Sequence, residues 1–201
     1  MSRVFQLPIS LSHLDLSHNA VTHLEPGTTW PSMNALLRLD LSHNGMQDSA
    51  LQHGSFANLL TLQRLDLSHN QLTRPPWESL GDLTSLQYLH LQHNRLTELP
   101  RAAFGRLPVV FELDLSSNQI SNVSARAFDG LLQLLTLNLT GNAITHLPNG
   151  ALQGESPRLQ GHLENTWRSL LSMECLIVVH ECLIVVHGST PRPRSGIAAY
   201  S

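Results

Sequence analysis

The sequence predicts an α/β repeat fold, a solenoid whose coils each add one short strand to a curved parallel sheet, with an irregular or short helical convex side. Three observations predict it. A leucine phrase recurs six times at a nearly constant interval, polar residues alternate with the last two leucines of each phrase, and an asparagine closes it. A single coil cannot bury its own leucines, so a core forms only where successive coils stack.

The repeated phrase has leucine at its first, fourth and sixth positions and asparagine at its ninth. One copy runs from Leu62 to Asn70 as Leu-Gln-Arg-Leu-Asp-Leu-Ser-His-Asn, and the fifth copy alone starts with a valine, Val110. The closing residues are Asn19, Asn44, Asn70, Asn94, Asn118 and Asn142, which lie 25, 26, 24, 24 and 24 residues apart. Such a phrase at a period of about 20–29 residues predicts a leucine-rich-repeat solenoid.

The six asparagines are expected to turn inward where each strand ends. There, the side-chain amide can donate and accept hydrogen bonds with the backbone of adjoining coils. A buried amide left unpaired would cost about 1–3 kcal/mol. We therefore predict that the asparagines form a hydrogen-bonded structural ladder and have no catalytic role.

The phrases predict how the chain is divided. In the 24-residue repeats a large apolar residue lies ten positions after the closing asparagine, and Phe5 lies at this position when the spacing is extended back by one repeat. The chain is therefore expected to begin inside a repeat. In the third unit, Pro75 and Pro76 favour an extended convex segment over a helix. The predicted parts are a partial repeat (1–10), six leucine-rich repeats (11–154), a possible capping helix (155–173), a tandem hydrophobic duplication (174–187) and a disordered tail (188–201).

The duplication repeats Glu-Cys-Leu-Ile-Val-Val-His without change and holds both cysteines of the chain. Such β-prone runs of low charge are an aggregation hazard when exposed; a duplicated stretch of transcript explains the exact copy most simply. Cys175, His180, Cys182 and His187 offer zinc ligands by type, but their spacing matches no familiar zinc ribbon. We expect no metal and no cofactor.

Composition and motifs exclude several classes of function. A formal net charge of -3 with 13% charged residues gives no basic field for nucleic acid, so that partner is not expected. The chain has no nucleophile elbow and no phosphate loop, and its histidines and aspartates recur with the repeat. We therefore predict neither an enzyme nor a small-molecule substrate.

Strand residues on the concave face are expected to form two columns across the coils. The first column reads His13, Arg38, Arg64, Tyr88, Glu112 and Thr136, and the second reads Asp15, Asp40, Asp66, His90, Asp114 and Asn138. The predicted protein-docking residues are Asp15, Arg38, Asp40, Arg64, Asp66, Tyr88, His90, Glu112 and Asp114. A plainer interpretation is that Asp-Leu-Ser-His-Asn is a common filling of this repeat, with arginines balancing the acids; for a metal site we favour that interpretation.

A further column precedes the asparagines and consists of His18, His43, His69 and His93. The expected interpretation is four solvated residues at strand ends. The alternative is a switch that titrates near pH 6–7 and makes association pH-sensitive.

Two sequons predict N-glycosylation, Asn122-Val-Ser and Asn138-Leu-Thr. Asn122 is expected just past a strand, where a glycan is easily accommodated. Asn138 falls within a strand phrase on the concave face, where a glycan would restrict docking at the sixth coil.

The segment Val-Phe-Glu-Leu-Asp-Leu-Ser-Ser-Asn at 110–118, continuing through 123–140, resembles the chaoptin type of arthropod photoreceptor adhesion protein. The resemblance implies a glycosylated, lipid-anchored protein on the extracellular face of the plasma membrane. It also implies cell–cell adhesion by like-with-like contact. The chain shows no recognisable signal peptide, cysteine cap, anchor signal or membrane-spanning segment.

The function expected from these features is a protein-binding leucine-rich-repeat module, a fragment of a chaoptin-type adhesion glycoprotein. Its partner is expected to be another protein, with a second copy of the chain as one possibility. The alternatives are part of a Toll-like, ligand-sensing surface ectodomain and an intracellular protein-interaction scaffold.

Overall fold

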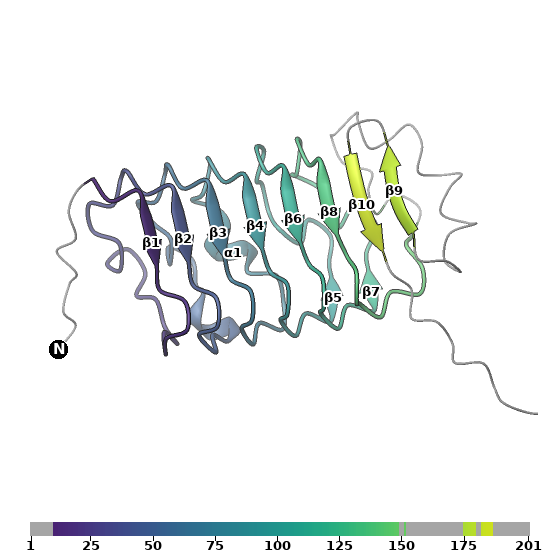
Figure 1. Ribbon diagram of the computed structural model, residues 1–201, viewed down its shortest axis with the longest axis horizontal. Helices are drawn as coiled ribbons and strands as arrows, with labels where there is room; N and C mark the ends of the chain where they lie inside the picture. The colour runs from purple at the N-terminus through teal and green to yellow at the C-terminus, as the bar shows by residue number, and fades with distance from the viewer. Residues whose placement is uncertain (1–9, 149–150, 152–174, 180–181, 187–201) are drawn as a thin grey trace, which may run out of the picture.

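The computed structural model describes residues 10–148, 151, 175–179 and 182–186, which form an elongated stack of coils (Figure 1). Each of the six leucine phrases contributes one strand to a single sheet: β1 (His13–Asp15), β2 (Arg38–Asp40), β3 (Arg64–Asp66), β4 (Tyr88–His90), β6 (Glu112–Asp114) and β8 (Thr136–Asn138). Neighbouring strands are parallel and equivalent positions of the phrase lie in register. The predicted leucine-rich-repeat solenoid is therefore confirmed.

The side of the coils away from this sheet carries short and varied elements. They are the 3-10 helix η1 (Asp48–Ala50), the helix α1 (Trp77–Leu80) and a two-stranded parallel sheet of β5 (Glu98–Leu99) and β7 (Asn122–Val123). The prediction of an extended segment in place of a helix around Pro75 and Pro76 is wrong, because α1 begins directly after Pro76. Proline is tolerated at a helix start, where its missing N–H would have no partner within the helix.

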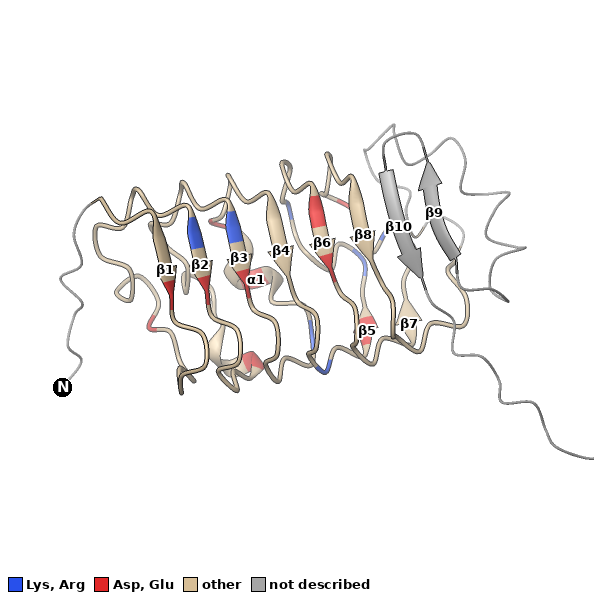
Figure 2. Ribbon diagram, in the orientation of Figure 1, with Lys and Arg blue, Asp and Glu red and all other residues tan. Residues whose placement is uncertain are grey.

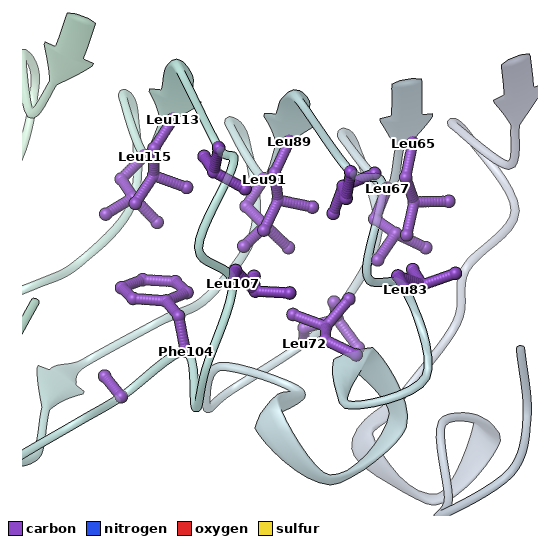
Figure 3. Packing of buried hydrophobic residues seen from close by; sticks show 14 of the residues in the cluster. Leu65, Leu67, Leu72, Leu83, Leu89, Leu91, Phe104, Leu107, Leu113 and Leu115 are labelled. Atoms are coloured by element: carbon purple, nitrogen blue, oxygen red, sulfur yellow. The ribbon is translucent and has the colours of Figure 1, made fainter. Parts of the chain in front are cut away.

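The core lies between these two sides and is built from the repeated leucines (Figure 3). From the second phrase onward the central and last leucines are almost fully buried, as Leu65, Leu67, Leu89 and Leu91 show with 0% exposure. Burying one such side chain contributes about 1.5–3 kcal/mol. Because each coil repeats the same positions, the core continues from coil to coil.

Five of the asparagines form a ladder at the strand ends. Asn44, Asn70, Asn94, Asn118 and Asn142 are buried and each bonds to a neighbouring coil. Asn94 is typical: its amide donates to the Leu67 carbonyl at 2.9 Å, and its oxygen accepts from the Leu72 N–H at 3.0 Å. Asn19 differs from this expectation because it is exposed and, among the described residues, donates within its own turn to the carbonyls of Leu16 and Ser17.

The tandem duplication extends the main sheet. Its copies form β9 (Cys175–Val179) and β10 (Cys182–Val186), which pair antiparallel with Ile177 opposite Ile184. Strand β10 in turn pairs with β8 in parallel. The predicted capping helix at 155–173 and the predicted tail at 188–201 lie outside the described residues, as do most of the partial repeat, His180 and His187. None of the described helices has the length and apolarity needed to cross a membrane.

Candidate functional site

The strands of the main sheet carry two rows of mostly polar residues on the face opposite the core, and Figure 2 marks the charged ones along the ribbon. In each three-residue strand the central leucine points inward, so the first and third residues share the outer face. The first row holds His13, Arg38, Arg64, Tyr88, Glu112 and Thr136, and the second holds Asp15, Asp40, Asp66, His90, Asp114 and Asn138. The structure thus brings all nine predicted docking residues onto one surface, which we call the sheet face.

The second row has a structural task in addition to its charge. In this row the side-chain oxygen accepts a hydrogen bond from the backbone N–H two residues later. The distance is 2.8 or 2.9 Å for the acids and 3.1 Å for the asparagine. The acceptors are Asp15, Asp40, Asp66, Asp114 and Asn138. These bonds hold the turn that ends each strand. The aspartate that recurs in the second row is therefore explained in part by this structural role at the end of each strand.

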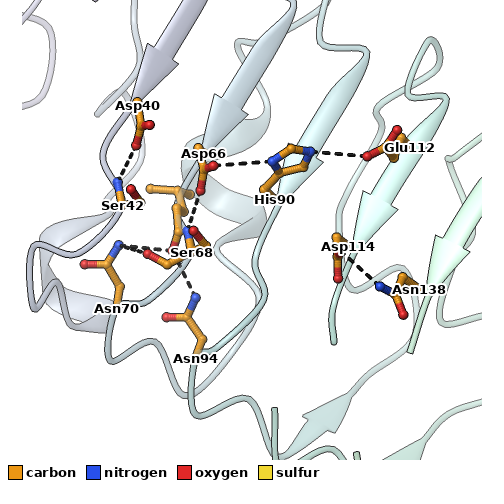
Figure 4. A network of polar contacts seen from close by, with 11 residues as sticks. Asp40, Ser42, Asp66, Ser68, Asn70, His90, Asn94, Glu112, Asp114 and Asn138 are labelled. Atoms are coloured by element: carbon orange, nitrogen blue, oxygen red, sulfur yellow. Dashed lines mark hydrogen bonds and ion pairs between the residues drawn. The ribbon is translucent and has the colours of Figure 1, made fainter. Parts of the chain in front are cut away.

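His90 joins three strands at the centre of the sheet face (Figure 4). Its Nδ1 lies 3.3 Å from Asp66 Oδ2, and its Nε2 lies 3.3 Å from Glu112 Oε1. The hydrogen bond to Asp66 raises the pKa of His90 and outweighs the opposing effect of burial. Burial raises the pKa of Asp66, but hydrogen bonds from His90 and Ser68 prevail and lower it. The cluster favours a charged imidazole between two carboxylates.

Arg38 and Arg64 are register partners on adjacent strands. The Arg64 guanidinium carbon lies 4.5 Å from the centre of the Tyr88 ring, a cation–π contact. Within the described part of the chain, no ion pair joins either arginine to a carboxylate. The expected balancing of the acids by these arginines therefore does not occur through direct contact.

The column of four histidines forms a continuous stack along the strand ends. Ring centres are 4.1, 4.0 and 4.2 Å apart from His18 through His43 and His69 to His93, with interplanar angles of 12–14°. Each of these residues is exposed and has a φ of 54 or 55°. Left-handed backbone is accessible to histidine more readily than to most residues. Partial desolvation within the stack and the neighbouring His43 and His93 lower the pKa of His69, against the opposing effect of Asp66.

The two sequons differ in access. Asn122 is exposed in β7, on the side of the coil away from the sheet face. Asn138 is partly buried in β8, where its amide donates to Asp114 Oδ2 at 3.1 Å and its oxygen accepts from the Thr140 N–H. The structure thus leaves Asn122 open and engages Asn138.

The described residues offer no candidate metal site. No group of three or more histidine, cysteine or acidic side chains there has an arrangement suited to an ion.

Stacked leucine coils, an asparagine ladder and a broad polar sheet face together define a leucine-rich-repeat solenoid, a fold whose rigid faces suit the binding of other proteins. The chain belongs to the leucine-rich-repeat family. A model described as Leucine rich repeat matches residues 49–96, 84–144 and 112–157, and a second Leucine Rich repeat model matches 8–23 and 33–52. No curated protein matches the chain.

Two solved structures illustrate the likeness in fold. The chain is similar to the TLR13 chain of a TLR13–ssRNA13 complex, with a TM-score of 0.65, 28% identity and coverage of 71% of this chain and 20% of that one. It is also similar in fold to a chain of the Drosophila Toll–Spatzle complex, with a TM-score of 0.55, 24% identity and coverage of 72% and 22%. The chain spans about a fifth of the length of these proteins. Neither structure points specifically to chaoptin.

Proposed function

We propose that the sheet face docks another protein, and that the chain acts in cell adhesion of the chaoptin type through like-with-like contact on the extracellular face of the plasma membrane. The observation that carries docking is the pair of in-register polar rows on six consecutive strands, supported by a continuous leucine core. Rigid faces of this kind are what solenoids offer to partners. The adhesion role is supported by the resemblance of residues 110–140 and by the open sequon at Asn122.

The proposal is for binding and not for catalysis. The repeated acids of the second row hold strand ends, and His90 is occupied by Asp66 and Glu112. These contacts account for the polar side chains without a reacting group. The charge pattern of the sheet face suits the binding of a partner with a complementary pattern.

A Toll-like ectodomain is the second candidate, favoured by the similarity to the two Toll-family structures. In this case the sheet face would take a separate ligand. The Toll structure contains Spatzle and the TLR13 structure contains single-stranded RNA. For this chain, a protein ligand fits better than RNA, because the second row of the sheet face is acidic and the formal net charge is -3.

Bead clustering tests the adhesion proposal. Beads coated with the full chain should cluster with each other, and replacing Tyr88 on the sheet face by alanine should weaken clustering. Trp77→Ala is the matched control, since Trp77 is 50% exposed on α1, across the core from the strands. Absence of clustering would contradict like-with-like adhesion and favour the Toll-like alternative. Equal loss in both variants would argue against the sheet face.

A further inference from the structure

We propose that Arg38 and Arg64 form a binding site for two carboxylates of an acidic segment in the docking partner. This inference rests on the proposed function of the sheet face and identifies the partner's chemistry there. Its basis is a pair of guanidinium groups that the fold places in register on adjacent strands, without a carboxylate partner among the described residues.

The two arginines differ from others that find an acid within the chain. Arg74 Nε lies 3.9 Å from Asp48 Oδ2, and Arg101 Nε lies 3.8 Å from Asp129 Oδ2. Arg38 and Arg64 have no such contact with any residue that the structure describes, although like charges placed opposite each other in a sheet repel. An anion placed between them would relieve that repulsion. His13, in register with Arg38 on β1, continues the basic side of the row.

The geometry at Arg64 leaves it able to take a ligand. Its guanidinium carbon lies 4.5 Å from the centre of the Tyr88 ring, a cation–π contact that leaves the group without a carboxylate partner among the described residues. The N–H donors lie along the edge of the planar guanidinium group and match the two oxygens of a carboxylate. Arg38 is exposed and can supply a second set of donors on the next strand. Tyr88 thus positions one half of the site.

The surrounding charges select a polypeptide over a uniform polyanion. Asp40 and Asp66 follow the arginines by two residues on the same strands and the same face. A sulfated polysaccharide or a nucleic acid that covered both rows would meet these carboxylates as well as the arginines. A protein segment can place acids over the first row and neutral or basic side chains over the second, so its charges can match both.

The test uses the full chain and two peptides. Ac-Gly-Glu-Gly-Glu-Gly-NH2 is titrated while the arginine Nε–Hε signals are followed by NMR, and the same peptide with glutamine in place of glutamate is the neutral control. The Arg38 and Arg64 signals should shift in a saturable way, and those of Arg74 and Arg101 should not. Arg64→Gln should weaken binding roughly two- to fivefold, the effect expected for one exposed ion pair. Arg101→Gln should leave binding unchanged.

Several results would overturn the inference. These are equal shifts with the glutamine peptide, equal shifts at Arg74 and Arg101, or tighter binding of a heparin hexasaccharide at the same two arginines. Circular dichroism of Arg64→Gln checks that the variant is folded. If beads cluster through the sheet face while the double variant Arg38→Gln/Arg64→Gln clusters normally, the inference fails and the docking function stands. If the peptide binds but no clustering occurs, the adhesion function fails and the carboxylate site stands.

Discussion

His90 Nδ1 lies 3.3 Å from Asp66 Oδ2, and this contact joins β4 to β3 across the middle of the sheet face. The side chains are 15% and 22% exposed, so solvent screens the pair only in part. The contact follows from the parallel register, which places position 90 beside position 66. The pair therefore makes the stability of the folded chain depend on pH.

The first prediction concerns this pair. The pKa of His90 is raised, so its contribution to stability is fully present below the ordinary histidine value of about 6.5 and is lost as pH rises through the raised value. The pKa of Asp66 is lowered, so its contribution is present above about 3.9 and is lost as pH falls through the lowered value. Replacing His90 by asparagine should remove the alkaline loss and cost about 0.5–1.5 kcal/mol near pH 6. Urea unfolding at several pH values measures both effects.

His93→Asn provides the control for this prediction, because His93 belongs to the exposed stack and makes no contact with Asp66. If His90→Asn and His93→Asn showed the same pH dependence, the pair would not be the source of the effect.

The second prediction concerns the asparagine ladder. Asn94→Ala removes the acceptor of the buried Leu72 N–H and one donor to each of the Leu67 and Leu91 carbonyls. These two carbonyls still accept from Asn70 and Asn118. We expect a loss of roughly 1–3 kcal/mol in the free energy of unfolding, the cost of one unsatisfied buried group. Asn19→Ala should cost less than about 0.5 kcal/mol, because Asn19 is exposed. Chemical denaturation compares them, and equal costs would refute the ladder.

The third prediction concerns His69, whose contribution to stability changes with pH in the opposite direction to that of His90. The pKa of His69 is lowered in the folded chain, so below about pH 6.5 the unfolded chain binds more protons at this site and stability falls with pH. The fall should end once the pH is below the lowered value. His69→Ser, which copies the natural Ser117 at the equivalent position, should reduce this acid sensitivity. NMR titration of the four ring signals should show His69 protonating at lower pH than a free histidine, and a raised value would contradict the stacked arrangement.

The fourth prediction concerns glycosylation in a secretory expression host. Asn122 should carry a glycan, because its side chain is exposed. Asn138 should carry little or none, because its amide is engaged by Asp114 on the neighbouring strand. Glycosidase treatment followed by peptide mass spectrometry measures both sites. Occupancy at Asn138 that equals or exceeds that at Asn122 would contradict the prediction.

The fold could be predicted from sequence because the solenoid is nearly one-dimensional. A leucine such as Leu65 contacts the same positions of the next coil, so spacing alone determines which residues pack together. The same argument places Asp66 beside His90. It fails for Asn19, whose burial depends on a neighbouring coil, and for α1, where the sequence Pro75-Pro76 suits both an extended segment and a helix start.

Side-chain orientation was the part of the site that spacing could not provide. The histidine column was evident from the sequence, but its stacking depends on the left-handed backbone at each member, such as His43. The Arg64–Tyr88 contact depends likewise on rotamers, as does the fact that no ion pair joins Arg38 to an acid in the described part of the chain. Of these, the left-handed turn had a recognisable signal, because Gly141 occupies the same position in the sixth phrase with a φ of 67°.

The most direct test of the account is photo-cross-linking between copies of the full chain on clustered beads, with p-benzoylphenylalanine placed at position 88 or at position 77. Both positions hold aromatic residues, one on the sheet face and one on α1 across the core. The account predicts cross-linked pairs from position 88 and none from position 77. Cross-links from position 77 as frequent as those from position 88 would contradict docking through the sheet face.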